Sequence, residues 1–395
     1  MPSDPPSPSL SLSSAPSSWL APRADGRRIA VGCMSGTSLD GLDAVWIEAQ
    51  GRGRELVVRV LGQADCGFGE LSTTLALAAR QEPLPVGALA RLGAALGRLH
   101  AELLGSRPDL PAPDLIAVHG QTLYHGRDAS FALFDPTALL AAQRCAIVTD
   151  LRLVDRAAGG EGAPITPLAD WLLLRGDRPR VVINLGGFCN LTRLPGAGGG
   201  LEAVSGGDVV PCNQLLDGAA RAWLGRDFDP EGQAASAGQE QPSAAALLER
   251  AFGAADGGPP RSLGTGDERW ELLDSLAWLG PEDALASLCA AIGRRIAAAA
   301  RGADELLLFG GGARNLALVA AIERAAREAH PTVRVLIGSP TDRRLGPQAR
   351  EGAAMAVLGL AAADGLAITL PAVTGRGATW HLDGRWCLPR SPGRP

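Results

Sequence analysis

The apolar residues of the chain follow two patterns. Short runs rich in Val, Ile and Leu are separated by longer segments in which apolar residues recur at the spacing of an amphipathic helix. Residues 86–104 show the helical pattern most clearly, because their leucines fall on one stripe. These are Leu89, Leu92, Leu96, Leu99 and Leu103.

The apolar runs predict strands and the periodic segments predict helices. Strands are expected at 29–33, 42–49, 56–65, 115–118, 131–134, 146–149, 181–184, 191–194, 305–309 and 333–337. Helices are expected at 70–80, 86–104, from Pro136 onward, and at 214–224, 244–252, 282–301, 316–329 and 348–363. Because strands alternate with helices, the pattern predicts an α/β fold built in layers.

One local arrangement occurs twice along the chain. In residues 29–49, a strand enters a glycine turn and a second strand leaves it, and residues 181–194 repeat this order. The repetition favours two duplicated halves, although the two copies are too different to prove an internal repeat. We expect a disordered Ser/Pro-rich tail at 1–26, domains at 27–155 and 156–380, and a second tail at 381–395.

The first glycine turn lies within residues 32–43 and combines glycines, hydroxyls and carboxylates. Its glycines let the backbone turn sharply and approach a ligand. Its hydroxyls, Thr37 and Ser38, can donate hydrogen bonds to phosphate oxygens. Its carboxylates, Asp40 and Asp43, need a cation between themselves and a phosphate, which points to Mg²⁺ held through water. A tight hairpin with polar turn residues is the simpler alternative, and the density of carboxylates and hydroxyls favours the phosphate interpretation.

Composition narrows the possible functions. The net charge is −5 and the chain has no basic patch, which argues against a nucleic-acid partner. Every cationic side chain is Arg, and the absence of lysine excludes a Walker A loop, a protein-kinase strand lysine and Schiff-base chemistry. A nucleotide would therefore be held by backbone amides, hydroxyls and Mg²⁺. No apolar run is long enough to span a membrane, and the scattered cysteines fit a reducing cytoplasm better than a disulfide framework.

Several segments together carry a family signature. Residues 32–43 match the pattern Gly-x-Met-Ser-Gly-Thr-Ser-x-Asp-Gly-x-Asp. Further matches follow in the right order, at 119–122, 150–152 with Asp155, 159–164, 184–190 and 310–315. Over about residues 29–374, the chain resembles the anhydro-N-acetylmuramic acid kinases, a family in the superfamily of acetate and sugar kinases, Hsc70 and actin.

The resemblance implies a two-domain actin-like ATPase (ribonuclease H-like) fold, with a five-stranded sheet in each domain and a cleft between the domains. It also implies ATP and Mg²⁺ as cofactors, with Asp40 as the metal ligand. The implied nucleotide-binding residues are Gly36, Thr37, Ser38, Leu39, Asp40, Gly41, Leu42 and Asp43 in a first phosphate loop, Gly186 and Gly187 in a second, and Gly310, Gly311, Gly312 and Asn315 on the adenosine side. For the last group, a tight turn without a ligand is the alternative.

By the same resemblance, the enzyme opens 1,6-anhydro-N-acetylmuramic acid with water and phosphorylates its 6-hydroxyl. The products are N-acetylmuramate 6-phosphate and ADP, in peptidoglycan recycling. The family's Asp-x-Gly-Pro-x-Asn motif matches Asp208 to Asn213, which makes Asp208 the implied general base, although a helix-capping Asp is the local alternative. Val210 replaces the glycine of this motif and Cys212 a commonly small residue, so we expect a displaced loop and an altered substrate or rate. Arg261 stands where the family usually carries Lys.

Glu351 is the second implied catalytic residue, and a solvent-facing Glu at a helix start is its alternative. The implied substrate-binding residues are His119, Thr122, Arg152, Asp155, Gly160, Gly162, Ala163 and Pro164. On local grounds, residues 150–164 could equally be a plain linker, His119 a buried histidine at a strand end, and Arg152 with Asp155 an ion pair. A kinase of a different sugar and a non-catalytic nucleotide-binding protein are the alternative functions. The expected partner is a small sugar, with neither nucleic acid nor membrane, and the family implies a cytoplasmic homodimer.

Overall fold

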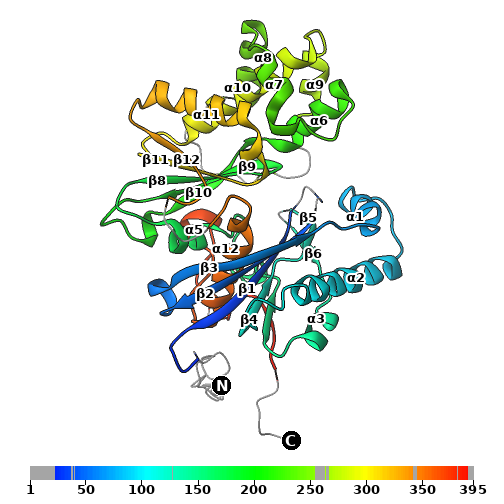
Figure 1. Cartoon of the computed structure of the whole chain (residues 1–395), viewed down its shortest axis with the longest axis vertical. Coiled ribbons are helices and arrows are strands. Elements are labelled where there is room, and N and C mark those ends of the chain that lie inside the picture. The colour runs from blue at the N-terminus through cyan, green and yellow to red at the C-terminus, as the bar shows by residue number, and fades with distance from the viewer. Residues whose placement is uncertain are drawn as a thin grey trace, which may run out of the picture.

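The computed structural model describes residues 23–36, 39, 41–126, 128–253, 263, 267–340, 345–379 and 381–389. Two large sheets organise these residues, one in each half of the molecule (Figure 1). The first sheet contains, in spatial order, β13 (Arg385–Cys387), β7 (Ala146–Thr149), β4 (Leu115–Val118), β1 (Arg28–Ser35), β2 (Leu42–Gln50) and β3 (Val57–Cys66).

The second sheet repeats this order from the opposite edge, without a counterpart of β13, so the first sheet has one strand more than the five expected. It contains β10 (Ser205–Pro211), β9 (Phe188–Leu194), β8 (Arg180–Leu185), β11 (Glu305–Phe309) and β12 (Arg334–Ile337). In each sheet the first three strands in chain order form an antiparallel meander, and the next two lie parallel to the first strand. The two meanders and their parallel partners are the duplicated halves that the sequence indicates, and the strand order is that of the actin-like, ribonuclease H-like fold.

Helices separate and cover the two sheets. The outer face of the first sheet packs against α1 (Leu71–Ala79), α2 (Val86–Gly105) and α3 (Thr137–Ala142). The outer face of the second packs against α6 (Asn213–Leu224), α10 (Pro281–Ala299) and α11 (Leu316–Ala329). The two inner faces share α5 (Pro167–Leu174) and α12 (Ala349–Ala363), which lie between the sheets (Figure 1).

The central strands are buried on both faces, as expected for parallel strands covered on two sides. In β1, Val31 and Cys33 face the outer core, whereas Ala30 faces the core shared with α12. The same alternation in β11 places Leu306 outward and Leu307 inward. Because these runs are apolar throughout, the sequence shows them as continuous hydrophobic segments rather than as alternating ones.

Helix α12 fits between the sheets because small residues and one ion pair accommodate it. A Cβ atom on Gly32 would lie 1.9 Å from the carbonyl oxygen of Gly352, so only glycine allows β1 and α12 to approach this closely. Arg350 and Asp170 pair within this layer, where Nη2 and Oδ2 are 2.6 Å apart and both side chains are essentially unexposed. Thr192 donates a further hydrogen bond to Asp170. The pair joins α12 to α5 inside a low-dielectric region, where each charge needs the other.

Several elements differ from those expected from the sequence. Strand β5 (Gln121–His125) was not expected and forms a hairpin with β6 (Ser130–Leu133), which overlaps the strand expected at 131–134. Strand β10 before α6 was not expected either. Short helix α4 (Leu153–Ala157) lies in a segment expected to be a loop, and α13 (Pro371–Thr374) lies where no element was expected. Around α10 and α6, α7 (Gln233–Ala237) and α9 (Glu271–Leu276) were not expected, whereas α8 (Pro242–Phe252) agrees with the helix expected at 244–252.

The end of the chain returns to the first half of the molecule. Helix α12 packs on β1, β2 and β4, and β13 pairs antiparallel with β7 at the edge of the first sheet. The expected C-terminal tail therefore contains a strand, and the segment expected in the second domain reaches the first sheet. No helix among the described residues has both the length and the apolar character needed to cross a membrane.

Candidate active site

The first glycine turn joins β1 to β2. Two hydrogen bonds hold Gly36 in this turn. Its carbonyl oxygen accepts from the backbone amide of Leu39 at 3.3 Å and from Nε2 of Gln121 at 3.2 Å. Gly41 allows close packing, since a Cβ atom there would lie 2.5 Å from the carbonyl oxygen of Cys66. Leu42 and Asp43 begin β2. The expected ligands Thr37, Ser38 and Asp40 lie outside the described residues.

The second glycine turn joins β8 to β9 at the equivalent place in the other half. Its carbonyls face the start of α6: Gly186 accepts from the amide of Asn213 at 3.0 Å, and Gly187 accepts from the amide of Cys212 at 2.8 Å. Nδ2 of Asn213 donates to the carbonyl of Leu185 at 3.0 Å. These bonds fix the turn against the helix and satisfy amide groups that a helix start leaves unpaired.

The third glycine turn joins β11 to α11 and packs beside the second. Gly310 has a φ of 85°, and a Cβ atom there would lie 2.8 Å from the carbonyl oxygen of Leu185. Gly311 is exposed, and an added Cβ would have one neighbour at 3.7 Å, so the backbone is open to a ligand here. Asn315 caps α11, because its Oδ1 accepts from the amide of Leu318 at 3.0 Å.

These contacts test whether the chain fits a nucleotide. Two glycine turns and the start of α6 meet on one side of the second sheet, with open backbone at Gly311. The buried Oε1 of Gln214, next to Gly187, has no hydrogen-bond partner among the described residues. Buried polar atoms of this kind often face a ligand or ordered water. The arrangement therefore fits a phosphate-bearing ligand held by backbone, as a chain without lysine requires.

Asp208 lies on β10, where the pairing with β9 is irregular. Asp208 is opposite Asn190 and Val210 is opposite Cys189, so Val209 is an extra residue in a β-bulge. Bulges bend a strand and re-aim its side chains, and they are common beside active sites. Oδ2 of Asp208 accepts a hydrogen bond of 2.6 Å from the amide of Leu263. Asp208 thus lies beside a bulge within a strand and is not a helix cap.

Burial raises the pKa of the Asp208 carboxyl to about 6, and the bond from Leu263 and the charge of Arg152 moderate the rise. A carboxylate with such a pKa is ionised at neutral pH and still basic enough to accept a proton. The negative charge of Asp267 raises the pKa further.

Val210, which stands at the glycine position of the motif, is part of this strand and follows the bulge. Val210 is buried and pairs with Cys189 on β9. Its φ does not lie in the left-handed region. A β-branched residue suits such an extended position. Cys212 is fully buried at the start of α6. The displacement expected at this loop, relative to other members of the family, stays a prediction, and the second departure, Arg261, lies outside the described residues.

Arg152 precedes α4 in the first half and reaches the same region. Its Nη2 lies 3.1 Å from Nε2 of His119, and its Nη1 donates to the carbonyl of Gly162. Nδ1 of His119 lies 2.9 Å from the carbonyl of Gly120 and is its donor, so Nε2 must accept from the guanidinium. Burial and the charge of Arg152 lower the pKa of His119 to about 3, which keeps the ring neutral. His119 follows β4, and Thr122 lies on β5, where it pairs with Ala132.

Asp155 is fully buried beneath the expected substrate loop. Its carboxylate accepts from the amide of Gly162 at 2.7 Å and from the hydroxyls of Thr374 and Thr369. A Cβ atom on Gly160 would lie 2.3 Å from Oδ2 of Asp155. The loop continues through Ala163 and Pro164, which are joined by a cis peptide bond. No Arg152–Asp155 ion pair is present, and Asp155 instead fastens the loop to the end of the chain.

Glu351 lies at the start of α12 and contacts the second half. Its Oε1 accepts from Nδ2 of Asn184, the last polar residue of β8, at 3.2 Å. Oδ1 of Asn184 is buried and without a partner among the described residues. Sequence reasoning gave Asn184 and Gln121 no individual role, although both fall inside the matched segments, because an amide at a strand end carries no local signal.

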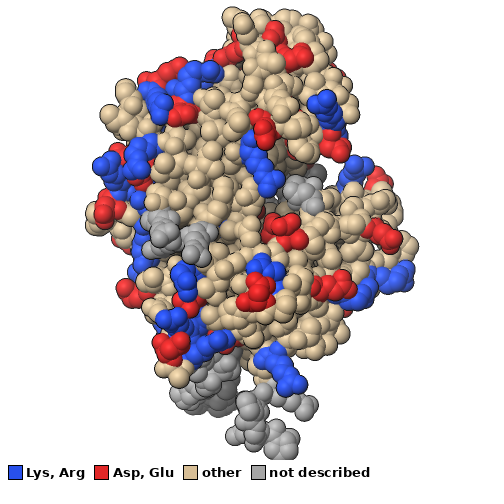
Figure 2. All heavy atoms as spheres, viewed as in Figure 1, with Lys and Arg blue, Asp and Glu red and all other residues tan. Residues whose placement is uncertain are grey.

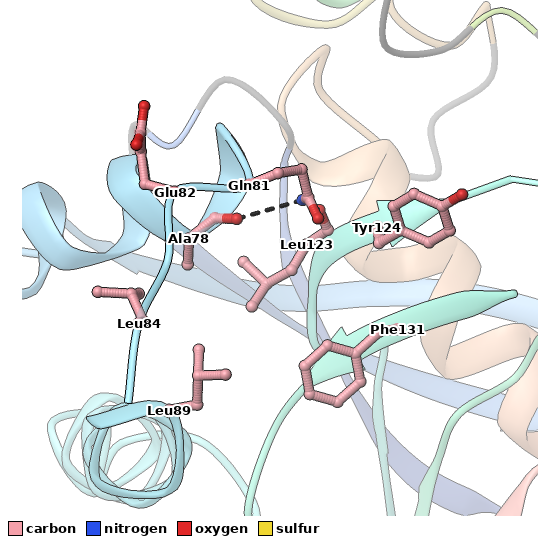
Figure 3. A pocket seen from close by; sticks show the side chains of 8 residues that line it. All are labelled: Ala78, Gln81, Glu82, Leu84, Leu89, Leu123, Tyr124 and Phe131. Carbon is pink, nitrogen blue, oxygen red and sulfur yellow. Dashed lines mark hydrogen bonds between the residues drawn. The ribbon is translucent and has the colours of Figure 1, made fainter. Parts of the chain in front are cut away.

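Charges of both signs are interspersed over the face shown in Figure 2, with no extended region of one sign. A separate apolar hollow of about 140 Å³ lies between the end of α1, α2 and the β5–β6 hairpin (Figure 3). Nε2 of Gln81 donates to the carbonyl of Ala78 at 3.2 Å, as Figure 3 shows, and to the carbonyl of Leu123 at 2.8 Å. Tyr124 and Phe131 line another side of the hollow. Its only charged lining residue is Glu82, so this hollow does not suit a phosphate.

Comparisons with known sequences cover most of the chain. The sequence model of the family described as "Anhydro-N-acetylmuramic acid kinase" matches residues 28–384. The chain is 31% identical to the anhydro-N-acetylmuramic acid kinase of Salinibacter ruber, over 92% of this chain and 97% of that protein. It is 36% identical to the protein of the same name from Burkholderia vietnamiensis, over 89% of this chain and 94% of that protein. The family match spans all three glycine turns and every strand of the two sheets except β13, which begins at Arg385.

Solved structures resemble the chain more distantly. Component A of the (R)-2-hydroxyglutaryl-CoA dehydratase of Acidaminococcus fermentans is 12% identical, with a TM-score of 0.41 over 85% of this chain and 99% of that chain. A ROK family glucokinase from Streptomyces griseus is 14% identical, with a TM-score of 0.35 over 84% of this chain and 99% of that chain.

Proposed function

The chain belongs to the anhydro-N-acetylmuramic acid kinase family, and from this premise we propose that it opens and phosphorylates 1,6-anhydro-N-acetylmuramate. Water adds to the anomeric carbon, and the bond from that carbon to the 6-oxygen breaks. The freed 6-oxygen forms a bond to the γ-phosphorus of ATP, and ADP leaves. The products are N-acetylmuramate 6-phosphate and ADP, consistent with a role in peptidoglycan recycling.

Asp208 is the general base in this proposal, and its environment is the observation that carries it. The attacking water must lose a proton, and the carboxylate of Asp208 accepts it. Its pKa of about 6, raised by burial, leaves the group ionised at neutral pH and more basic than an exposed aspartate. The bulge at Val209 aims the side chain out of the sheet, and Leu263 fixes one carboxylate oxygen. Glu351 has the second catalytic role, positioning the sugar beside Asn184.

The nucleotide is assigned to the three glycine turns. Gly36 to Asp43 and the turn at Gly186 and Gly187 take the phosphates, while the turn from Gly310 to Asn315 lies on the adenosine side. Asn315 acts through the helix that it caps. Mg²⁺, when bound, neutralises charge on the transferred phosphoryl group.

Asp40 is assigned as the protein ligand of Mg²⁺, through water. Among the described residues no group of three or more His, Cys, Asp or Glu side chains could hold a metal ion. Mg²⁺ is commonly held by one or two carboxylates, with water and phosphate oxygens as its other ligands. The donor set of this chain is therefore compatible with the ion.

The sugar is assigned to the region where the two halves meet. His119, Thr122 and Arg152 contribute side chains from the first half. The loop with Gly160, Gly162, Ala163 and Pro164 forms one wall and is held from below by Asp155. Asp155 therefore acts by positioning the loop and does not touch the sugar.

A product assay tests the proposal. The protein is incubated with ATP, Mg²⁺ and 1,6-anhydro-N-acetylmuramate, and the products are identified by mass spectrometry beside parallel reactions with N-acetylmuramate or no sugar. We expect N-acetylmuramate 6-phosphate with stoichiometric ADP from the anhydro sugar alone. ADP release that is independent of sugar, or strongest with another sugar in a panel, would refute it. Asp208→Asn is expected to lose nearly all turnover while retaining ATP binding by calorimetry.

The remaining assignments concern location and assembly. We propose that the protein is cytoplasmic, in line with its free cysteines at every described cysteine position. We also propose a homodimer, as the family implies. Light scattering across a concentration series measures the mass directly, and a monomer at all concentrations would contradict the second assignment.

A further inference from the structure

The part of the chain that follows α12 returns to the loop assigned to the sugar. We call residues 158–164 the sugar loop, and residues 368–379 with 381–387 the C-terminal segment. This segment contains α13 and ends in β13, which pairs with β7, the strand after which α4 and the sugar loop follow. The sequence predicts only a tail from residue 381 onward, and β13 lies beyond the family match. The role of the segment must therefore be judged from its contacts.

Two backbone hydrogen bonds join the C-terminal segment to the sugar loop. The amide of Glu161 donates to the carbonyl of Thr374 at 2.9 Å, and the amide of Gly377 donates to the carbonyl of Ala158 at 2.8 Å. The hydroxyl of Thr374 also donates to Oδ1 of Asp155 at 2.7 Å. Thr374, at the end of α13, thus holds both the backbone of the loop and the carboxylate beneath it.

A series of buried side chains continues behind Asp155. Nη1 of Arg376 donates to the hydroxyl oxygen of Thr369 at 2.8 Å, and that hydroxyl donates in turn to Oδ1 of Asp155. Oδ2 of Asp155 accepts from the amide of Gly162 at 2.7 Å. Because each group polarises the next, hydrogen bonds in such a series reinforce one another. The guanidinium of Arg376 is thus connected to the sugar loop through two side chains.

The carboxylate partner of Arg376 is Asp383. Nη1 of Arg376 lies 3.2 Å from Oδ1 and 3.3 Å from Oδ2 of Asp383, and both side chains are 2% exposed. Oδ2 of Asp383 also accepts from the amide of Ile368 at 3.0 Å. A buried ion pair is often no more stabilising than apolar side chains of the same volume. What this pair supplies is a fixed position for the group that donates to Thr369.

We propose that the C-terminal segment positions the sugar loop, and that Thr374 and Arg376 are the positioning residues that set the affinity for the sugar. A Cβ atom on Gly160 would lie 2.3 Å from Oδ2 of Asp155, so the loop backbone packs directly on this carboxylate and must follow its position. Thr374 and Arg376 act through Asp155 and the loop, and neither touches the sugar. The inference rests on the proposed function, because that function assigns this loop to the sugar.

Two substitutions of Thr374 test its hydroxyl. Val has nearly the shape of Thr but cannot donate to Asp155, whereas Ser can. For Thr374→Val we expect KM for the anhydro sugar to rise about tenfold, near the lower end of what a hydrogen bond to a charged group contributes. Because the loop is assigned to the sugar and not to the nucleotide, kcat and KM for ATP should change by less than about twofold. Thr374→Ser should remain close to the wild type.

Thr192→Val is the matched control. Thr192 also donates from a buried hydroxyl to a buried carboxylate, Oδ2 of Asp170 at 2.6 Å, but this bond joins β9 to α5 and not to the sugar loop. The control should lose comparable stability in urea and leave KM for the sugar unchanged. If Thr374→Val loses stability and also leaves that KM unchanged, the hydroxyl only stabilises the fold and the inference is overturned.

A double variant tests Arg376 without leaving a buried charge. Arg376→Met alone should be destabilised, because Asp383 remains buried and unpaired. Adding Asp383→Asn removes that charge and retains an acceptor for the amide of Ile368. We expect the double variant to recover stability and still to show a raised KM for the sugar. A double variant with the KM of the wild type would contradict the role of Arg376.

Hydrogen exchange separates this inference from the proposed function, because it needs no substrate. The amides of Gly160, Glu161 and Gly162 are hydrogen-bonded to Asp155 or Thr374, so they should exchange faster in Thr374→Val than in the wild type. They should not change in Thr192→Val. Unchanged exchange in Thr374→Val would refute the inference. A wild type that phosphorylates a different sugar would refute the proposed function alone, and the comparison of KM would then use that sugar.

Discussion

Replacing Asp208 with Asn is expected to stabilise the protein while inactivating it. Burial raises the carboxyl pKa from its ordinary value of 3.8 to about 6. At about 1.4 kcal/mol per unit of pKa, keeping the carboxylate ionised in the folded protein costs about 3 kcal/mol. Asn has the same shape, carries no charge, and retains an oxygen for the amide of Leu263. The variant should therefore avoid most of that cost.

The expected gain depends on pH with a definite sign. The folded-state pKa lies above the unfolded one, so between about pH 4 and pH 6 the folded protein binds more protons than the unfolded chain. Its stability falls as pH rises through this interval. The advantage of Asp208→Asn should be near zero at pH 4 and reach its full value above pH 6.

Thermal unfolding of wild type and variant across this range is the measurement. Unfolding entropy of about 2 cal/mol/K per residue converts 3 kcal/mol into a Tm increase of about 4 °C for a chain of this length. Asp274→Asn is the control, because Asp274 is exposed on α9 and should show no such pH dependence. A variant less stable than the wild type at neutral pH, or a difference that ignores pH, would refute the electrostatic reasoning.

Three further predictions concern the framework. Gly32→Ala should destabilise the protein by about 1–3 kcal/mol or more in denaturant, because its Cβ would collide with α12, whereas Gly105→Ala, with open space around it, should be neutral. Arg350→Met should cost about 3–5 kcal/mol by leaving Asp170 buried and unpaired, and a double variant that also replaces Asp170 with Leu should recover most of it. Burial lowers the pKa of His100 to about 4, so stability should fall as pH drops from about 6.5 to 4, and His100→Leu should flatten that part of the denaturation profile.

The strands that are apolar throughout can be predicted from the sequence. A strand that contains residues of low strand propensity cannot. The ranges expected for β4, β7 and β11 agree with the structure, since each is a short run of apolar residues. Strand β10 was missed because Gly206, Gly207 and Pro211 weaken its strand propensity, and pairing with β9 outweighs that weakness. Helix α5 was missed for the opposite reason, because it is buried nearly all round and shows no polar face.

The electrostatic environment of the site is harder to predict from the sequence than its turns. A glycine turn after a strand can be recognised locally: the first and second turns join adjacent strands, and the turn at Gly311 joins β11 to α11. The environment of Asp208 cannot be recognised locally, because its carboxylate accepts from the amide of Leu263, 55 residues further along the chain, and its pKa also responds to the charge of Arg152 from the other half of the molecule. The pKa that makes Asp208 a useful base arises from that assembly. Chemistry at this junction is therefore a property of the packed halves, and a sequence motif identifies its residues without determining their protonation.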